Sequence, residues 1–237
     1  MIDDIEALLF DKDGTLVDFD RTWGPAAGAV MQTLAAGDAA RLAELHRISA
    51  YVPEQRRFLP SSPLLAGSSI HYGPSWAQAL GVPASADFLR RIDRLFAREG
   101  LRHLTPIGNP VCALGRLAAA GLSLAMVTND AEANARQQVA ALGLSRWLVA
   151  IYGYDSGHGS KPDPGMVRAC AAHGGHAPSR VAVVGDTAHD LDAARGAGAR
   201  FILVRSGPAP VAHLAAAADL VIDSVDDLPQ ALLGRRG

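Results

Sequence analysis

The sequence has few cysteines: only Cys112 and Cys170 occur among its 237 residues. Two isolated cysteines cannot build the disulfide framework that small secreted domains use, and the sequence has no Cys-x-x-Cys pair of the kind that holds zinc. We therefore expect a protein of a reducing compartment, and we do not expect a structural zinc site.

Long apolar runs and a strong net charge are missing as well. The apolar run within residues 1–10 is too short for a signal peptide, and no stretch approaches the length of a membrane span. The formal net charge is −2, so no global basic field indicates nucleic acid or an acidic membrane surface as a partner. The expectation is a cytoplasmic protein that binds neither.

The sequence does contain a regular alternation of apolar, strand-like runs with alanine-rich, helix-like segments. Continuously apolar runs of this kind are typical of parallel strands that are covered on both faces. Strands are expected at 7–11, 122–130, 148–155, 180–186, 200–206 and 218–223, with helices at 109–121, 131–143, 163–175 and 190–198. The pattern predicts an α/β fold with a Rossmann-like, doubly wound parallel sheet.

The interval from 18 to 103 breaks this rhythm, because it contains no clear strand. Its helix-like segments are separated by turns rich in proline and serine, and they span 22–37, 38–51, 72–81 and 85–100. The first strand is therefore far from the second along the chain. We expect two units, namely an α/β catalytic core and an inserted helical cap domain, with the bounds 1–17 plus 104–237 and 18–103.

The first expected strand ends in two like charges, Asp11 and Asp13, on either side of Lys12. Burying like charges so close together costs free energy unless a partner compensates them. Because side chains alternate along a strand, the two aspartates are expected to face the same way and Lys12 to point elsewhere. The aspartates could also belong to a turn or a helix cap, although a cap needs only one carboxylate.

Three later strand ends carry further polar groups. Open parallel sheets bind ligands at the carboxyl ends of their strands. At these ends the sequence has Thr128 and Asn129, then Lys161, and finally Asp186 and Asp190. Taken singly, each could be a helix cap or a solvated surface residue. Together they bring carboxylates, hydroxyl and amide groups and one ammonium to one edge of the sheet.

This set of groups suits phosphoryl transfer. A carboxylate can attack phosphorus and form an aspartyl phosphate, while a second carboxylate protonates the leaving alcohol and then deprotonates the attacking water. Mg²⁺ takes oxygen ligands from carboxylates and phosphate and neutralises the charge of both. Lysine and hydroxyl donors stabilise the charge on the phosphoryl oxygens.

Four motifs in this order resemble those of the haloacid dehalogenase-like superfamily of hydrolases. They are "DKDGT" at 11–15, "TN" at 128–129, "KP" at 161–162 and "GDTAHD" at 185–190. The insert after the first motif is similar to the helical cap of the phosphoglycolate-phosphatase-like branch, and the resemblance spans nearly the whole chain. Lys12 departs from the apolar residue that is common in this branch. Because we expect it to point away from the aspartates, we expect little chemical effect.

The resemblance implies a role for each matched residue. Asp11 looks like the nucleophile and Asp13 like the general acid/base. Thr128 and Asn129 match the phosphate-binding pair, and Lys161 matches the lysine that holds the nucleophile and the phosphate together.

The resemblance also implies Mg²⁺ as the cofactor. Its ligands would be Asp11, the backbone carbonyl of Asp13 and Asp186, while Asp190 either joins the metal through water or orients its neighbours. The expected function is a Mg²⁺-dependent phosphatase that acts on a small phosphorylated metabolite, either phosphoglycolate-like or a sugar phosphate. Neither the substrate itself nor the oligomeric state can be read from the sequence.

Two other functions remain as alternatives. A phosphotransferase such as a sugar-phosphate mutase shares every core residue and differs in where the phosphoryl group goes. A non-catalytic module that binds a phosphorylated ligand could keep the metal site, but it would not need both Asp11 and Asp13. A halide-releasing dehalogenase is disfavoured, because that chemistry requires neither Asp13 nor Mg²⁺.

Substrate selection is expected in the helical insert, where two segments are candidates. Arginine binds carboxylates well, and the first segment, 46–58, contains His46, Arg47, Tyr51, Arg56 and Arg57. The second segment, 70–76, contains His71, Tyr72 and Trp76. A solvated charged helix face in the first segment, and aromatic packing inside the insert in the second, are the alternatives.

Overall fold

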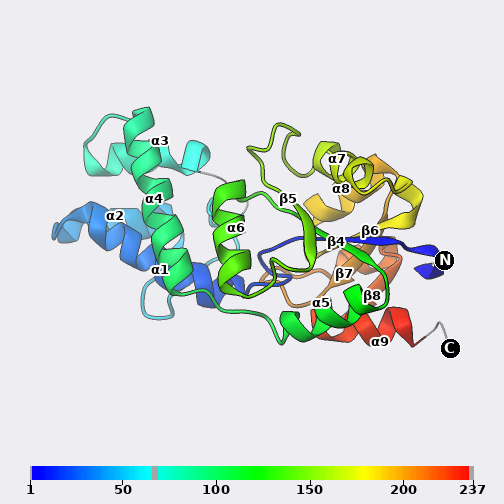
Figure 1. Cartoon of the computed structure of the whole chain (residues 1–237). Coiled ribbons are helices and arrows are strands. Elements are labelled where there is room, and N and C mark those ends of the chain that lie inside the picture. The colour runs from blue at the N-terminus through cyan, green and yellow to red at the C-terminus, as the bar shows by residue number, and fades with distance from the viewer. Residues whose placement is uncertain (1, 66–68, 235–237) are drawn as a thin grey trace. The chain divides into compact units, whose positions relative to one another are not determined.

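The computed structural model describes residues 2–65 and 69–234 of the chain, and it divides them into two compact units (Figure 1). The first unit comprises residues 1–18 together with 106–237, and the second comprises residues 19–105. The chain crosses between the units at 18/19 and 105/106, whereas the sequence indicated 17/18 and 103/104. Each unit has its own hydrophobic core.

A six-stranded sheet with the strand order β5-β4-β1-β6-β7-β8 forms the centre of the first unit. Every neighbouring pair is parallel, which confirms the predicted α/β fold. The strands are β1 (Ala7–Phe10), β4 (Ser123–Val127), β5 (Leu148–Tyr152), β6 (Val181–Gly185), β7 (Arg200–Val204) and β8 (Leu220–Ile222). Strand β1 lies between β4 and β6, and this placement brings three of the motif-bearing strand ends together.

Helices cover both faces of this sheet, which is why its central strands are apolar at every position (Figure 1). Alternate residues of β1 point to opposite faces: Leu8 and Phe10 pack with α5, α6 and α9, whereas Ala7 and Leu9 pack with α7 and α8. These helices are α5 (Pro110–Ala119), α6 (Glu132–Ala141), α7 (Gly165–His173), α8 (Ala188–Ala197) and α9 (Leu228–Leu233). Short 3₁₀ helices occupy Ile2–Asp4, Pro178–Arg180, Ala212–Ala217 and Val225–Asp227.

The second unit is mainly helical, and its apolar side chains pack on one another. Its helices are α1 (Phe19–Ala35), α2 (Ala39–Ile48), α3 (Ser69–Leu80) and α4 (Ala86–Arg102). The expectation that this interval contains no strand is wrong, because a hairpin of β2 (Tyr51–Val52) and β3 (Arg57–Phe58) follows α2. Two-residue strands are too short to show a period in the sequence, and the rings of Tyr51 and Phe58 pack at 5.4 Å between centroids.

Candidate active site

The carboxyl ends of β1, β4 and β6 carry the candidate site, and backbone hydrogen bonds continue the sheet into it. The Asp11 N–H donates to the Val184 carbonyl at 2.8 Å, and the Thr128 N–H donates to the Tyr152 carbonyl at 2.9 Å. The residues that follow β1 and β4 are therefore fixed by the sheet itself. Gly14, with a φ of +85°, then turns the chain, a conformation that glycine adopts without steric cost.

Three carboxylates meet at this edge. One oxygen from each of Asp11, Asp186 and Asp190 lies within 4.8 Å of the others, and all three residues are buried. The Lys161 ammonium donates to Asp11 Oδ1 at 2.5 Å and to Asp190 Oδ1 at 2.6 Å. One ammonium thus faces three acidic side chains, and the cluster keeps an excess of acidic groups.

The pKa values follow from this crowding. The pKa of Asp11 is raised to about 7, mainly by burial; the Asp190 carboxylate adds to the rise, and the Lys161 ammonium opposes it. Burial also raises the pKa of Asp186 well above its usual range, and the Asp11 and Asp190 carboxylates add to the shift. Burial by itself would lower the pKa of Lys161, but Asp11 and Asp190 outweigh it and raise that pKa. Lys161 therefore stays an ammonium.

Two oxygens at the site lack a partner within the part of the chain that the structure describes. Asp186 Oδ1 and Thr15 Oγ1 are both buried, and neither forms a hydrogen bond with another described residue. A buried carboxylate oxygen without a partner is costly and calls for a ligand. The Asp186 side chain is also closely enclosed, since a Cβ added to Gly14 or Gly207 would clash with its carboxylate.

The side chains of Asn129 and Asp190 both form hydrogen bonds with Lys161. The Asn129 side chain donates to the Lys161 carbonyl at 2.9 Å and accepts from the Lys161 N–H at 2.8 Å. Asp190 Oδ2 accepts from the Thr187 N–H at 3.0 Å and from its hydroxyl at 2.6 Å, so a capping box at the start of α8 holds the carboxylate. Of the two roles left open for Asp190, these contacts favour the orientation of its neighbours. Thr128 Oγ1 accepts from the Asp130 N–H at 3.1 Å.

The expectation that Lys12 points away from the aspartates is wrong. Its Nζ lies 2.7 Å from Asp13 Oδ2 and 3.0 Å from Asp130 Oδ2, and it donates to Gln138 Oε1 at 2.7 Å. Side-chain alternation holds within β1, which ends at Phe10, whereas Lys12 and Asp13 lie beyond that end and in the turn. Burial would lower the pKa of Lys12, but Asp13 and Asp130 outweigh it and raise that pKa.

The sequence argument missed three residues of this region. Asp130 and Gln138 contact Lys12, and the Ser206 hydroxyl donates to the Gly14 carbonyl at 2.8 Å. Two of them could have been found, because Asp130 directly follows a motif and Ser206 follows β7 at the same edge of the sheet. No sequence motif marks Gln138 as a site residue, because its contact with Lys12 depends on how α6 packs on the sheet.

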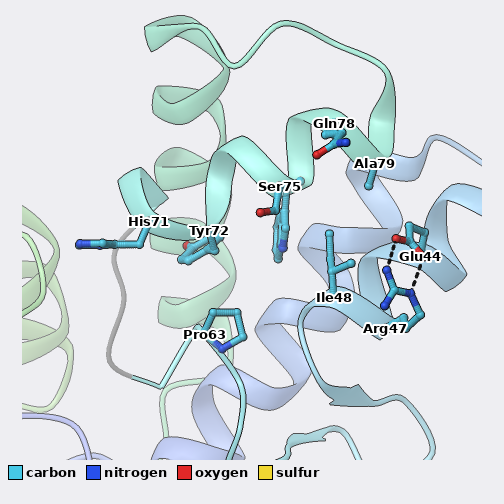
Figure 2. A pocket seen from close by; sticks show the side chains of 10 residues that line it. Glu44, Arg47, Ile48, Pro63, His71, Tyr72, Ser75, Gln78 and Ala79 are labelled. Atoms are coloured by element: carbon cyan, nitrogen blue, oxygen red, sulfur yellow. Dashed lines mark hydrogen bonds and ion pairs between the residues drawn. The ribbon is translucent and has the colours of Figure 1, made fainter.

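A cavity of about 470 Å³ lies within the second unit, between α2 and α3 (Figure 2). Arg47 borders it and is held by Glu44 through hydrogen bonds of 2.7 and 2.5 Å. Trp76 is fully buried and donates its indole N–H to Ser49 Oγ at 3.0 Å. The lining residues are Glu44, Arg47, Ile48, Pro63, His71, Tyr72, Ser75, Trp76, Gln78 and Ala79.

Two further candidates of the second unit, Tyr51 and Arg57, have hydrogen-bond partners inside it. The Tyr51 hydroxyl donates to the Gly24 carbonyl at 2.9 Å, and Arg57 donates to Gln55 at 2.5 Å.

Among the helices that the structure describes, none is both long and apolar enough to cross a membrane.

Comparisons with known proteins extend over most of the chain. Residues 5–198 match the family model of the haloacid dehalogenase-like hydrolases. A phosphoglycolate phosphatase from Rhodospirillum rubrum is 31% identical over 90% of this chain and 86% of its own length. One from Chromobacterium violaceum is 31% identical over 94% of this chain and 95% of its own length.

Solved structures share the fold. A candidate β-phosphoglucomutase from Thermotoga maritima has a TM-score of 0.71 and 21% identity, covering 97% of this chain and 99% of that protein. A hydrolase of the same family from Deinococcus radiodurans was solved with bound phosphate and sodium. It has a TM-score of 0.67 and 24% identity, and the match covers 98% of this chain and 96% of that protein. The chain therefore belongs to the haloacid dehalogenase-like hydrolases, in the phosphoglycolate-phosphatase-like branch of phosphatases within that family.

Proposed function

We propose that this protein is a Mg²⁺-dependent phosphatase that hydrolyses a small phosphomonoester through an aspartyl phosphate on Asp11. The observation that carries the proposal is the buried group of Asp11, Asp186 and Asp190 around a single ammonium, that of Lys161. Such a group needs further positive charge to be stable when ionised. A divalent cation fits this need.

The residues present fit Mg²⁺. The ion prefers oxygen ligands and is usually held by one or two carboxylates together with the phosphate of a substrate, and Asp186 Oδ1 is a buried carboxylate oxygen without a partner among the described residues. Asp11 and Asp186, with the backbone carbonyl of Asp13, are the proposed ligands. When bound, Mg²⁺ would neutralise charge on the phosphoryl oxygens and orient the phosphorus for in-line attack.

In the first step an Asp11 carboxylate oxygen attacks phosphorus, and the bond from phosphorus to the ester oxygen breaks. Lys161 holds Asp11 in place, and Thr128 and Asn129 are the proposed contacts for the phosphoryl oxygens. The leaving oxygen takes a proton from the Asp13 carboxyl group, so the alcohol departs neutral. Asp11 then carries the phosphoryl group and Asp13 is a carboxylate.

In the second step a water molecule attacks the phosphorus of the aspartyl phosphate. Asp13, now a carboxylate, takes the proton of that water, and the bond between phosphorus and Asp11 breaks. Inorganic phosphate leaves, Asp11 is again a carboxylate and Asp13 is again protonated. Both residues thus return to their starting states without any further reactant.

The proposed substrate is phosphoglycolate or a small sugar phosphate. The first choice rests on the relatives from Rhodospirillum rubrum and Chromobacterium violaceum, which are named for phosphoglycolate. We further propose that the unit of residues 19–105 is the cap that selects the substrate and that, by excluding bulk water, it protects the intermediate.

Phosphate release from a panel of phosphorylated metabolites, with and without Mg²⁺, tests this proposal. We expect wild-type release only with Mg²⁺ and none from Asp11→Asn. Asp192→Asn is the matched control, because it removes an exposed carboxylate of α8, and it should release phosphate like the wild type. Isomerised sugar phosphate without phosphate release would indicate a mutase instead. Binding without any turnover would indicate a non-catalytic module.

A further inference from the structure

Lysine is rare in this chain, and both of its lysines are buried at the candidate site. Lys12 and Lys161 are the only two among 22 lysine and arginine residues, and their side chains are 1% and 4% exposed. Arginine presents a planar guanidinium, whereas lysine presents a compact ammonium whose three N–H donors can meet three separate acceptors. A chain that otherwise uses arginine thus has the compact cation at these two buried positions.

The two lysines have matching surroundings. Lys161 joins Asp11, the proposed nucleophile, to a second buried carboxylate. Lys12 joins Asp13, the proposed acid/base, to Asp130. Each aspartate that is proposed to react therefore contacts its own buried ammonium, and each ammonium is anchored by another aspartate that does not react.

The anchor of Lys12 is α6 and the residues just before it. Asp130 accepts from the Ala131 N–H at 2.7 Å and from Asn134 at 2.5 Å, which fixes its carboxylate at the start of that helix. Gln138 is fully buried one helical turn beyond Asn134 and supplies the third acceptor. The Lys12 ammonium is thus tied to a helix that packs against the sheet.

Asp13 needs such a tether more than Asp11 does. It lies on the turn after β1, and its side chain is 22% exposed, so packing alone does not determine the direction of its carboxylate. The ammonium contacts Oδ2 and thereby sets the direction in which Oδ1 points. We propose that Lys12, anchored by Asp130 and Gln138, is a positioning residue that aims the Asp13 carboxyl group at the leaving oxygen and the attacking water. This inference rests on the proposed function.

A test must separate this role from that of a buried ion pair that only stabilises the fold. Comparing a substrate whose leaving group needs no proton with one whose leaving group does need a proton distinguishes the two roles. An aryl phosphate such as p-nitrophenyl phosphate releases a stable anion and depends little on an acid, whereas an alkyl phosphate depends on it strongly. If Lys12 acts through Asp13, its loss should slow alkyl transfer far more than aryl transfer.

The experiment compares Lys12→Met, Asp13→Asn and the double variant with the wild type, all loaded with Mg²⁺. Single-turnover phosphorylation of Asp11 is measured with p-nitrophenyl phosphate and with the fastest alkyl phosphomonoester of the panel. For Lys12→Met we expect alkyl transfer to fall about 10- to 100-fold, which is less than the roughly 100- to 10,000-fold that a general acid contributes in full, because Asp13 is still present but misdirected. Aryl transfer should fall less than about threefold, and KM should change little. The double variant should be no slower than Asp13→Asn, since residues that act as one unit are not additive.

Equal losses on both substrates, or additive losses in the double variant, would overturn the inference while leaving the proposed function intact. No phosphate release by the wild type on any substrate would overturn both. If Lys12→Met does not fold, Asp130→Asn takes its place, because it keeps the side-chain volume and weakens the anchor of Lys12 by removing one charge, while Gln138 stays. That variant should show the same preference for the aryl substrate, with a smaller loss, and an unchanged preference would overturn the inference.

Discussion

At the scale of single residues, Asp11 shows how burial changes the chemistry of a carboxyl group. Its pKa rises from 3.8 to about 7, although Lys161 donates to it at 2.5 Å. In the folded metal-free protein, Asp11 therefore binds a proton below about pH 7 that it would lose near pH 4 when unfolded. Ionisation of this group destabilises the metal-free fold as the pH rises through this window, and a bound cation reverses the effect.

This leads to a prediction for Mg²⁺ binding. Below about pH 7 the proton on Asp11 competes with the ion, so the Kd for Mg²⁺ should rise by up to about tenfold for each pH unit. We expect saturating Mg²⁺ to raise the melting temperature more at pH 8 than at pH 6, and calorimetric titration should give the tighter Kd at pH 8. A larger stabilisation at pH 6 would contradict a buried, proton-binding metal ligand.

At the scale of elements, the start of α8 links stability to the site. The Thr187 hydroxyl caps the helix and donates to Asp190 Oδ2, while Asp190 Oδ1 accepts from Lys161. The helix cap and the hydrogen bond to Lys161 at the candidate site therefore share one carboxylate. Loss of the cap should change both the folding free energy and the position of the ammonium.

Thr187→Ala should lower the free energy of unfolding by about 1 kcal/mol, as loss of a cap does, and should also reduce kcat severalfold. Ser224→Ala is the matched control, because Ser224 forms a capping box with Asp227 at another position in the same unit. Denaturant unfolding and steady-state kinetics measure the two effects. Equal kcat values for the two variants would show that the Thr187 cap has no part in orienting Lys161.

The elements also show which features the sequence could predict. The parallel sheet was predictable because strands that are covered on both faces are apolar at every position, as in β1 and β6. The hairpin at Tyr51 was not, since two residues per strand set no period. The contacts of Lys12 were not predictable either, because alternation fails beyond Phe10 and Gln138 reaches the site only through the packing of α6.

At the scale of the whole molecule, the chain builds two cores, and the aromatic one belongs to the helical unit. Trp76 is fully buried there, and its ring lies 5.1 Å from that of Tyr72 and 6.0 Å from that of Phe96. The first unit has its own clusters on both faces of the sheet. Stability of the helical unit and metal binding by the α/β unit should therefore respond to different substitutions.

Trp76→Ala should lower the free energy of unfolding by about 3–5 kcal/mol, since it removes a large buried side chain. Under conditions where the variant is folded, its Kd for Mg²⁺ should stay within about twofold of the wild type, because the proposed ligands lie in the other unit. Calorimetric titration with Mg²⁺ checks this. Loss of Mg²⁺ binding in a folded Trp76→Ala variant would contradict the assignment of the metal site to the α/β unit alone.

The most direct test of the whole account is the chemical state of Asp11 during turnover. The wild type, mixed with Mg²⁺ and substrate and quenched in acid, is digested and its peptides are analysed by mass spectrometry. We predict one phosphoryl group on Asp11 in the wild type and none in Asp11→Asn, which should also release no phosphate. Steady phosphate release without a phosphorylated Asp11, together with retained turnover by Asp11→Asn, would contradict the account.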